Sequence, residues 1–305
     1  MRAILLPRIL VASGIIFLVL AVRPLPIVSA TDLSVGMVSF TFDDGRDGQR
    51  TIAAGLLSYY NIKGTAFDYI TSLTKGQGFM TLTQLRDLRD FYGWEIGDHT
   101  FTHSNLDSMT GQQLQQEIVG SKNEFSKRGF NVTTFAYPYS QGQQNQAAVR
   151  LVKQNYLGAR SASTSQRAYL YGGSSDIYDI VANNVANTTK PETVKAWVDQ
   201  AVLQKKLLVL SFHQIVQDNP SFDTFYSASN LGIIVSYVHG KVVAGTLETV
   251  TFRQGIDTLA KLASTNVASL SAIGGVFLGI LGVVTTGLVG AVAIMARKRR
   301  GTHHT

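Results

Sequence analysis

The sequence predicts an α/β protein built on a parallel sheet with helices outside it, either open or closed into a barrel. Strand-like and helix-like segments alternate from residue 31 to about residue 261. The run 207–212 is almost wholly apolar, as expected of a strand that is buried on both faces. Polar residues with catalytic potential fall at the ends of the strand-like segments, which is where parallel α/β folds build their sites.

The elements follow from the apolar spacing. The first strand is predicted at 35–42, because Val38, Phe40 and Phe42 share one face of an extended segment. Further strands are predicted at 64–67, 94–96, 132–137, 156–161, 207–212 and 241–245. Helices are predicted at 50–60, from Thr81 or Thr83 to 91, at 110–129, around 147–152, at 191–204 with Pro191 in the first turn, and at 222–239. The pattern is weakest between residues 163 and 187.

The two ends of the chain resemble membrane-targeting segments. Residues 1–30 combine early arginines, an apolar run and small residues up to Ala30, which predicts a secretory signal peptide; an uncleaved N-terminal anchor is the alternative. Residues 270–296 contain no charged side chain and are long enough to span a bilayer. The basic tail 297–305 follows and is expected on the cytoplasmic side, which puts the domain 31–261 outside the cell, joined by a linker at 262–269.

The formal charge of +7 does not indicate a nucleic-acid partner. Residues 1–30 carry three basic residues and residues 297–305 carry four, with no acid in either segment, so the remainder is formally neutral. The chain has no cysteine, so an exported domain must be held together by its core or a metal rather than by disulfides. The oligomeric state is not predicted.

Two adjacent carboxylates, Asp43 and Asp44, end the first predicted strand. Neighbouring anions repel each other unless a cation or a proton separates their roles. A metal ion on one of them would leave the other free to act as a general base. The alternative is an ordinary strand-to-turn junction, where Asp and Gly are common.

Two histidines follow the segment 94–96. His99 and His103 are four residues apart, a spacing that lets both face one side of a helical turn and bind one ion. Together with a carboxylate from another strand end they form a His-His-Asp set with an open fourth position. His213 ends the strand 207–212, and its alternative interpretation is a buried core histidine.

Four motifs in this order and spacing resemble those of the polysaccharide deacetylases, carbohydrate esterase family four. They are Thr41-Phe42-Asp43-Asp44, His99-Thr100-Phe101-Thr102-His103, Tyr137-Pro138-Tyr139 and Leu210-Ser211-Phe212-His213. The resemblance covers about residues 35–246. It implies a distorted (β/α) barrel and hydrolytic removal of N- or O-acetyl groups from carbohydrate polymers.

The resemblance also implies the role of each site residue. Asp43 would be the general base, Tyr139 would offer its backbone N–H to the oxyanion, and His213 would protonate the leaving group. Asp44, His99 and His103 would bind one divalent ion, with Zn²⁺ favoured and Co²⁺, Ni²⁺ or Mn²⁺ as the other candidates. Glu95 and Asp98 are interpreted as supporting or surface residues without a firm role.

The sequence departs from the family pattern in two places. Ala136 stands where the family has the arginine that steadies the catalytic aspartate, and no clear Asp-x-x-Asp-Trp motif is present to orient His213. Arg160 is the candidate replacement because it ends the next predicted strand and is the one charged residue between Lys153 and Arg167. The alternative is a solvated arginine at a strand end.

Three functions remain open at this stage. The favoured one is a membrane-anchored, extracellular, metal-dependent deacetylase of acetylated glycans. The second is a hydrolase of a small amide or an acetyl ester, and the third is a non-catalytic glycan-binding relative. Retention of both carboxylates and all three histidines favours catalysis over binding alone.

Overall fold

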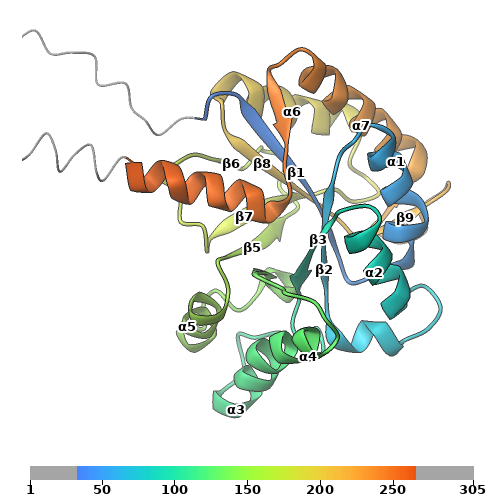
Figure 1. The fold of residues 1–305 in the computed structure, drawn as a ribbon. Helices are drawn as coiled ribbons and strands as arrows, with labels where there is room; N and C mark the ends of the chain where they lie inside the picture. Colours follow the sequence, from blue (N-terminus) through green and yellow to red (C-terminus); the bar gives the residue numbers. More distant parts are fainter. Residues whose placement is uncertain (1–32, 266–305) are drawn as a thin grey trace, which may run out of the picture.

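The fold is a closed parallel barrel in a computed structural model that describes residues 33–265 (Figure 1). Seven parallel strands follow each other around it, and β8 pairs with β1 to close the circle. In order they are β1 (Gly36–Asp43), β2 (Gly64–Asp68), β3 (Glu95–Asp98), β4 (Thr134–Ala136), β5 (Gly158–Ser163), β7 (Ile180–Asn184) and β8 (Leu207–Phe212). The (β/α) barrel expected from the sequence is therefore present. Of the two arrangements that the sequence left open, an open sheet and a closed barrel, the structure has the closed barrel.

Two short strands extend the sheet beside the barrel. The strand β11 (Leu247–Thr249) runs parallel to the first residues of β1, and β6 (Leu170–Tyr171) runs antiparallel to β8. The strands β9 (Gln214–Val216) and β10 (Phe225–Ser227) form a separate pair after β8. The region of weak pattern thus contains a barrel strand, β7, which the sequence analysis missed.

Successive side chains of β1 point alternately to the outside and to the inside of the barrel, and so belong to two different apolar clusters. Val38, Phe40 and Phe42 face outward and pack with the surrounding helices in the larger apolar cluster. Met37 belongs to the smaller cluster inside the barrel, and the side chain of Asp43 lies on the same inward face three pairs of residues further on. The last residue of β1 therefore places the carboxylate of Asp43 at the open end of the barrel.

Helices surround the strands on the outside of the barrel (Figure 1). They are η1 (Gln49–Ala53), α1 (Ala54–Tyr59), η2 (Ile70–Thr74), α2 (Leu82–Asp90), α3 (Gly111–Leu114), η3 (Gln115–Gly120), α4 (Ser121–Lys127), η4 (Pro138–Ser140), α5 (Gln146–Asn155), α6 (Pro191–Gln204) and α7 (Ala228–Val243). Thr81 begins α2 with a complete capping box, and Pro191 occupies the first turn of α6, as predicted.

The predicted strand at 241–245 is wrong. Residues 241–243 form the last turn of α7, because Val242 continues the helical spacing set by the buried Val235 and Val238. Gly245 then adopts a left-handed backbone with φ of 68°, which ends the helical segment, and the strand begins only at Leu247.

A helix over residues 252–265 covers the end of the barrel where the strands begin. Its Phe252 and Ile256 pack against Leu207 and Met37, which lie at the starts of β8 and β1. The helix runs past residue 261, where the predicted domain ended, so the first residues of the predicted linker are helical. The opposite end of the barrel, where the strands finish, stays open for a site.

None of the helices within residues 33–265 has the length and apolarity needed to cross a bilayer. The predicted signal peptide at 1–30 and the predicted transmembrane helix at 270–296 both lie outside the described residues.

Candidate metal centre and active site

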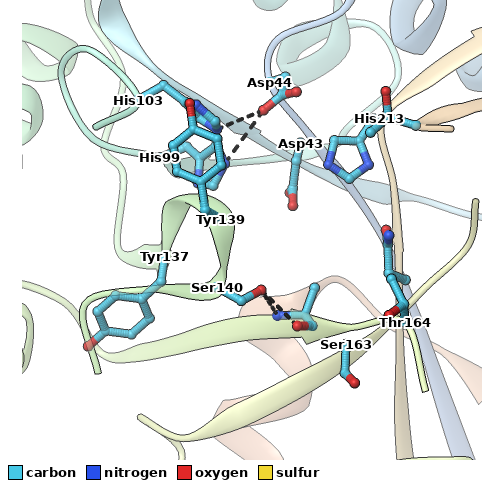
Figure 2. A pocket seen from close by; sticks show the side chains of 13 residues that line it. Asp43, Asp44, His99, His103, Tyr137, Tyr139, Ser140, Ser163, Thr164 and His213 are labelled. Carbon is cyan, nitrogen blue, oxygen red and sulfur yellow. Dashed lines mark hydrogen bonds and ion pairs between the residues drawn. The ribbon is translucent and has the colours of Figure 1, made fainter. Parts of the chain in front are cut away.

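A pocket of about 480 Å³ opens at the carboxyl ends of the barrel strands. Figure 2 shows His99 and His103 on one side of this pocket, His213 on the other, and Asp43 and Asp44 between them. These residues come from the ends of β1, β3 and β8. Closure of the barrel therefore brings residues of the first, second and last sequence motifs together in this pocket. Tyr139 of the third motif also lines it.

Asp44, His99 and His103 have the arrangement of a metal-binding triad. One potential ligand atom from each residue lies within 4.8 Å of the other two. The Oδ1 atom of Asp44 is 3.0 Å from Nε2 of His103 and 3.7 Å from Nε2 of His99. Two imidazoles and one carboxylate suit Zn²⁺ and other borderline divalent ions.

The tautomer of His99 fits metal binding. Its Nδ1 lies 2.7 Å from the carbonyl oxygen of Ala136, and only an N–H can donate to a carbonyl. The lone pair of Nε2 is thereby left for a ligand. Burial lowers the pKa of His99 to about 4, against the opposing effect of Asp43, so the ring stays neutral near pH 7.

The two histidines do not share a helical turn, contrary to the sequence expectation. They lie in a loop in which Thr100 and His103 both have a left-handed backbone, with φ of 76° and 64°. Asp98 and Glu117 hold this loop in place: Asp98 accepts the N–H of Thr100 at 2.9 Å, and Glu117 accepts from the N–H and hydroxyl of Thr102. The left-handed residues turn the loop so that both rings reach Asp44.

Asp98 is a buried structural carboxyl rather than a surface residue. Besides Thr100, it accepts hydrogen bonds from the hydroxyls of Ser121 and Tyr156, both at 2.7 Å. Burial raises its pKa to about 7, although these donors lower it. Asp98 thus ties the loop after β3 to α4 and to the end of α5.

Asp43 is held on both of its oxygens. The guanidinium of Arg160 donates to Oδ1, and the hydroxyl of Ser211 donates to Oδ2 at 3.2 Å. Arg160 is only 1% exposed, and its guanidinium stacks over the Phe67 ring at 4.5 Å. The contact expected between Arg160 and Asp43 is therefore present, and the alternative of a solvated Arg160 is wrong.

The sheet register explains how Arg160 can replace an arginine at Ala136. The two positions are direct partners on the neighbouring parallel strands β4 and β5. Parallel partners point to the same side of a sheet, so both face the barrel interior. Burial of Asp43 opposes its ionisation, but Arg160 and the nearby histidines outweigh it and hold the pKa of this carboxyl below its usual value.

His213 and Tyr139 line opposite parts of the pocket. The His213 side chain is half-buried, and its Nδ1 has no hydrogen-bond partner among the described residues. Tyr139 has a left-handed backbone with φ of 55°, and its exposed ring lies 4.5 Å from the ring of His103. The catalytic roles assigned to both residues stay predictions.

Several residues of the site were not identified from the sequence. Ser211 was quoted in a motif without a role, yet it is the one polar residue on the inward face of β8, which is the signal that could have found it. Small polar side chains also line the pocket: Ser140, Ser163, Thr164, Asn184 and Thr224. They carry no motif, so only the barrel geometry brings them together.

Glu95 lies far from the triad at the start of β3. It accepts hydrogen bonds from the hydroxyls of Thr65 and Thr134 and from the backbone N–H of Arg253 at 2.7 Å. Arg253 is in the first turn of the helix 252–265, where a carboxylate satisfies a free helical N–H. Glu95 thus attaches that helix to the barrel.

A barrel with a candidate metal-binding triad and a buried, arginine-paired aspartate has groups suited to hydrolysis. In agreement, residues 30–159 match the sequence model of a family described as polysaccharide deacetylase. The match confirms the resemblance to that family for the part of the chain that carries β1 to β4, both carboxylates and the histidine pair.

The chain is also similar to individual proteins. The protein YxkH of Bacillus subtilis (strain 168), which carries a provisional polysaccharide deacetylase name, is 30% identical over 113 residues; these cover 37% of this chain and 39% of that protein. The crystal structure of a peptidoglycan N-acetylglucosamine deacetylase has a TM-score of 0.50 at 16% identity, and the alignment covers 75% of this chain and 91% of that one. A family 4 carbohydrate esterase from Streptomyces lividans has a TM-score of 0.48 at 17% identity, with 72% and 95% covered.

Proposed function

We propose that this chain is a metal-dependent hydrolase that removes acetyl groups from N-acetylated or O-acetylated carbohydrate polymers. One observation carries the proposal: the carboxylate of Asp43, held ionised by Arg160, lies in the same pocket as the metal-type triad (Figure 2). A structural metal site would not need a second, separately held carboxylate beside it.

Asp44, His99 and His103 would hold the divalent ion. When bound, such an ion polarises the acetyl carbonyl and lowers the pKa of water. Asp44 suits this task because it is ionised: burial raises the pKa of its carboxyl, but the hydrogen bond from His103 and the other effects of the nearby histidines lower it by more.

Asp43 would take the proton from the attacking water. A base must be ionised to act, and the lowered pKa keeps Asp43 ionised well below neutral pH. His213 lies across the pocket, where its ring would protonate the departing amine or alkoxide. The backbone N–H of Tyr139 would donate to the developing oxyanion.

Acetate release from N-acetylglucosamine oligomers by the purified full chain, with and without a chelator, tests the proposal. We expect release that is lost with chelator and restored by a divalent ion. The variant Asp43→Asn should lower release by about 10²–10⁴-fold, whereas Asp87→Asn, which changes a partly exposed carboxylate paired with Arg50, should not. Release from small acetamides alone would favour the small-amide hydrolase, and binding without release would favour the glycan-binding relative.

The proposed location is the cell membrane, with the catalytic domain outside and the tail 297–305 in the cytoplasm. The support is the signal-like segment 1–30 and the apolar segment 270–296 of the sequence. Protease added to intact cells should remove the domain and leave a small C-terminal fragment in the membrane fraction. A domain that is fully protected until the cells are lysed would contradict this topology.

A further inference from the structure

Two cations and two aromatic rings form a patch beside Asp44 that the proposed chemistry does not use. We call it the cation-aromatic patch, and it consists of Arg46, Tyr69, Lys75 and Phe79. The Arg46 guanidinium lies 4.3 Å from the centre of the Phe79 ring. The Lys75 Nζ atom lies 5.0 Å from the same ring and 4.9 Å from that of Tyr69.

Backbone contacts hold this patch against the loop that carries Asp44. Arg46 and Phe79 form an antiparallel bridge. On either side of it, the N–H of Met80 donates to the carbonyl of Gly45 at 2.8 Å, and the N–H of Asp47 donates to that of Gly78 at 3.3 Å. The patch is therefore built onto the site and keeps a defined position relative to it.

The patch borders the metal-type triad directly. Arg46 Nε lies 3.9 Å from Oδ2 of Asp44, the carboxylate oxygen that is not the one nearest the histidines. The Tyr69 ring is 5.1 Å from the ring of His103. A sugar polymer whose acetyl group enters the pocket would place a neighbouring sugar unit near this patch.

The positive charge of Lys75 is not neutralised by an ion pair within the described residues. The Lys75 side chain is exposed, whereas Arg46 has Asp44 as its ion-pair partner. The Arg46 side chain is 28% exposed. Apart from its two carboxylates and three histidines, the pocket next to the patch is lined by neutral side chains.

We propose that the cation-aromatic patch binds an oxyanion, carboxylate or phosphate, on the sugar unit next to the one that is deacetylated. Guanidinium and ammonium groups are the usual partners of both oxyanions, and the half-buried Phe79 ring gives an apolar face for a sugar to cover. The proposal rests on the proposed function and names its substrate class: an acetylated glycan that also carries negative charge.

The test uses three N-acetylglucosamine oligosaccharides that differ at one substituent on the unit next to the reacting one: a hydroxymethyl, a carboxylate or a phosphate. Turnover by the full chain is measured on each at low and at high salt. Lys75→Gln is the main variant because Lys75 does not contact Asp44. Lys63→Gln is the matched control, since it removes an exposed lysine at the start of β2, at the opposite end of the barrel.

We expect kcat/KM to be about fivefold higher on at least one anionic substrate than on the neutral one, because a single exposed charge contact contributes up to about this factor. High salt and Lys75→Gln should both reduce the preference, and Lys63→Gln should not. Preference for the carboxylate alone or the phosphate alone would identify the source of the oxyanion.

Binding separates failure of this inference from failure of the proposed function. Titration of the full-length Asp43→Asn variant with the three oligosaccharides measures affinity without turnover. Tighter binding of an anionic oligosaccharide that depends on Lys75 would support the patch even if no substrate released acetate. Equal affinity for all three, or a preference that survives Lys75→Gln, would overturn the inference.

Discussion

Replacement of Arg160 by alanine is the sharpest test of how Asp43 is kept functional. The ion pair is buried, with exposed side-chain fractions of 1% for Arg160 and 6% for Asp43. Arg160→Ala removes the cation and leaves the burial, so the pKa of the Asp43 carboxyl should rise. A protonated Asp43 cannot act as a base, and its orientation then depends on Ser211 alone.

The expected magnitudes follow from this burial. Loss of one partner of a buried ion pair typically costs about 3–5 kcal/mol of stability, which is a large part of the usual stability of a domain. Loss of a general base typically costs about 10²–10⁴-fold in rate. Because the pKa of Asp43 rises, the acid limb of the pH-rate profile should move to higher pH, and activity should partly return under alkaline conditions.

The assay is acetate release as a function of pH, together with metal content and thermal unfolding of each variant. Arg160→Lys should restore activity only in part, because an ammonium group lacks the planar fork of a guanidinium. Arg50→Ala is the control: it breaks an ion pair that is partly exposed, with an expected cost of about 1 kcal/mol or less.

A second arginine position provides the converse experiment. Ala136 pairs with Arg160 in the sheet register and is also buried inside the barrel. Ala136→Arg in the Arg160→Ala background should therefore recover activity if the two positions serve one role. Near wild-type turnover by folded Arg160→Ala, with an unshifted pH profile, would refute the reasoning.

Three further predictions follow from the site and the barrel. His103→Ala should lower metal occupancy of the purified protein, and full occupancy would mean that the ion binds elsewhere. Asp43→Asn and His213→Ala should each keep the metal but lose about 10²–10⁴-fold in turnover, as measured by acetate release; near wild-type rates in either would reject its assigned role. Burial raises the pKa of Glu95 despite its hydrogen bonds, so the folded state binds this proton more tightly than the unfolded chain, whose value is near 4.5. Stability from urea unfolding should therefore fall as pH rises above about 4.5, and Glu95→Gln should flatten this dependence; an unchanged slope would contradict it.

Local sequence was sufficient for most elements of the barrel. The helix 191–204 and the strand 207–212 occur with the predicted bounds, because a proline at the first turn and a continuous apolar run are strong local signals. The missed strand β7 ends in Asn183 and Asn184, which are poor strand formers. It forms because β5 and β8 supply hydrogen-bond partners on both sides.

Residue identity and order along the chain determined the chemistry that this protein can carry. Asp43, Asp44 and the three histidines are visible as groups with matching roles because ligand and proton-transfer chemistry depends on residue type. The tertiary structure decided which of these groups meet and in what state. Barrel closure sets Arg160, 117 residues further along the chain, against Asp43, and it turns Ser211 to the same carboxylate. Such contacts depend on strand register and on burial, which no local stretch of sequence encodes.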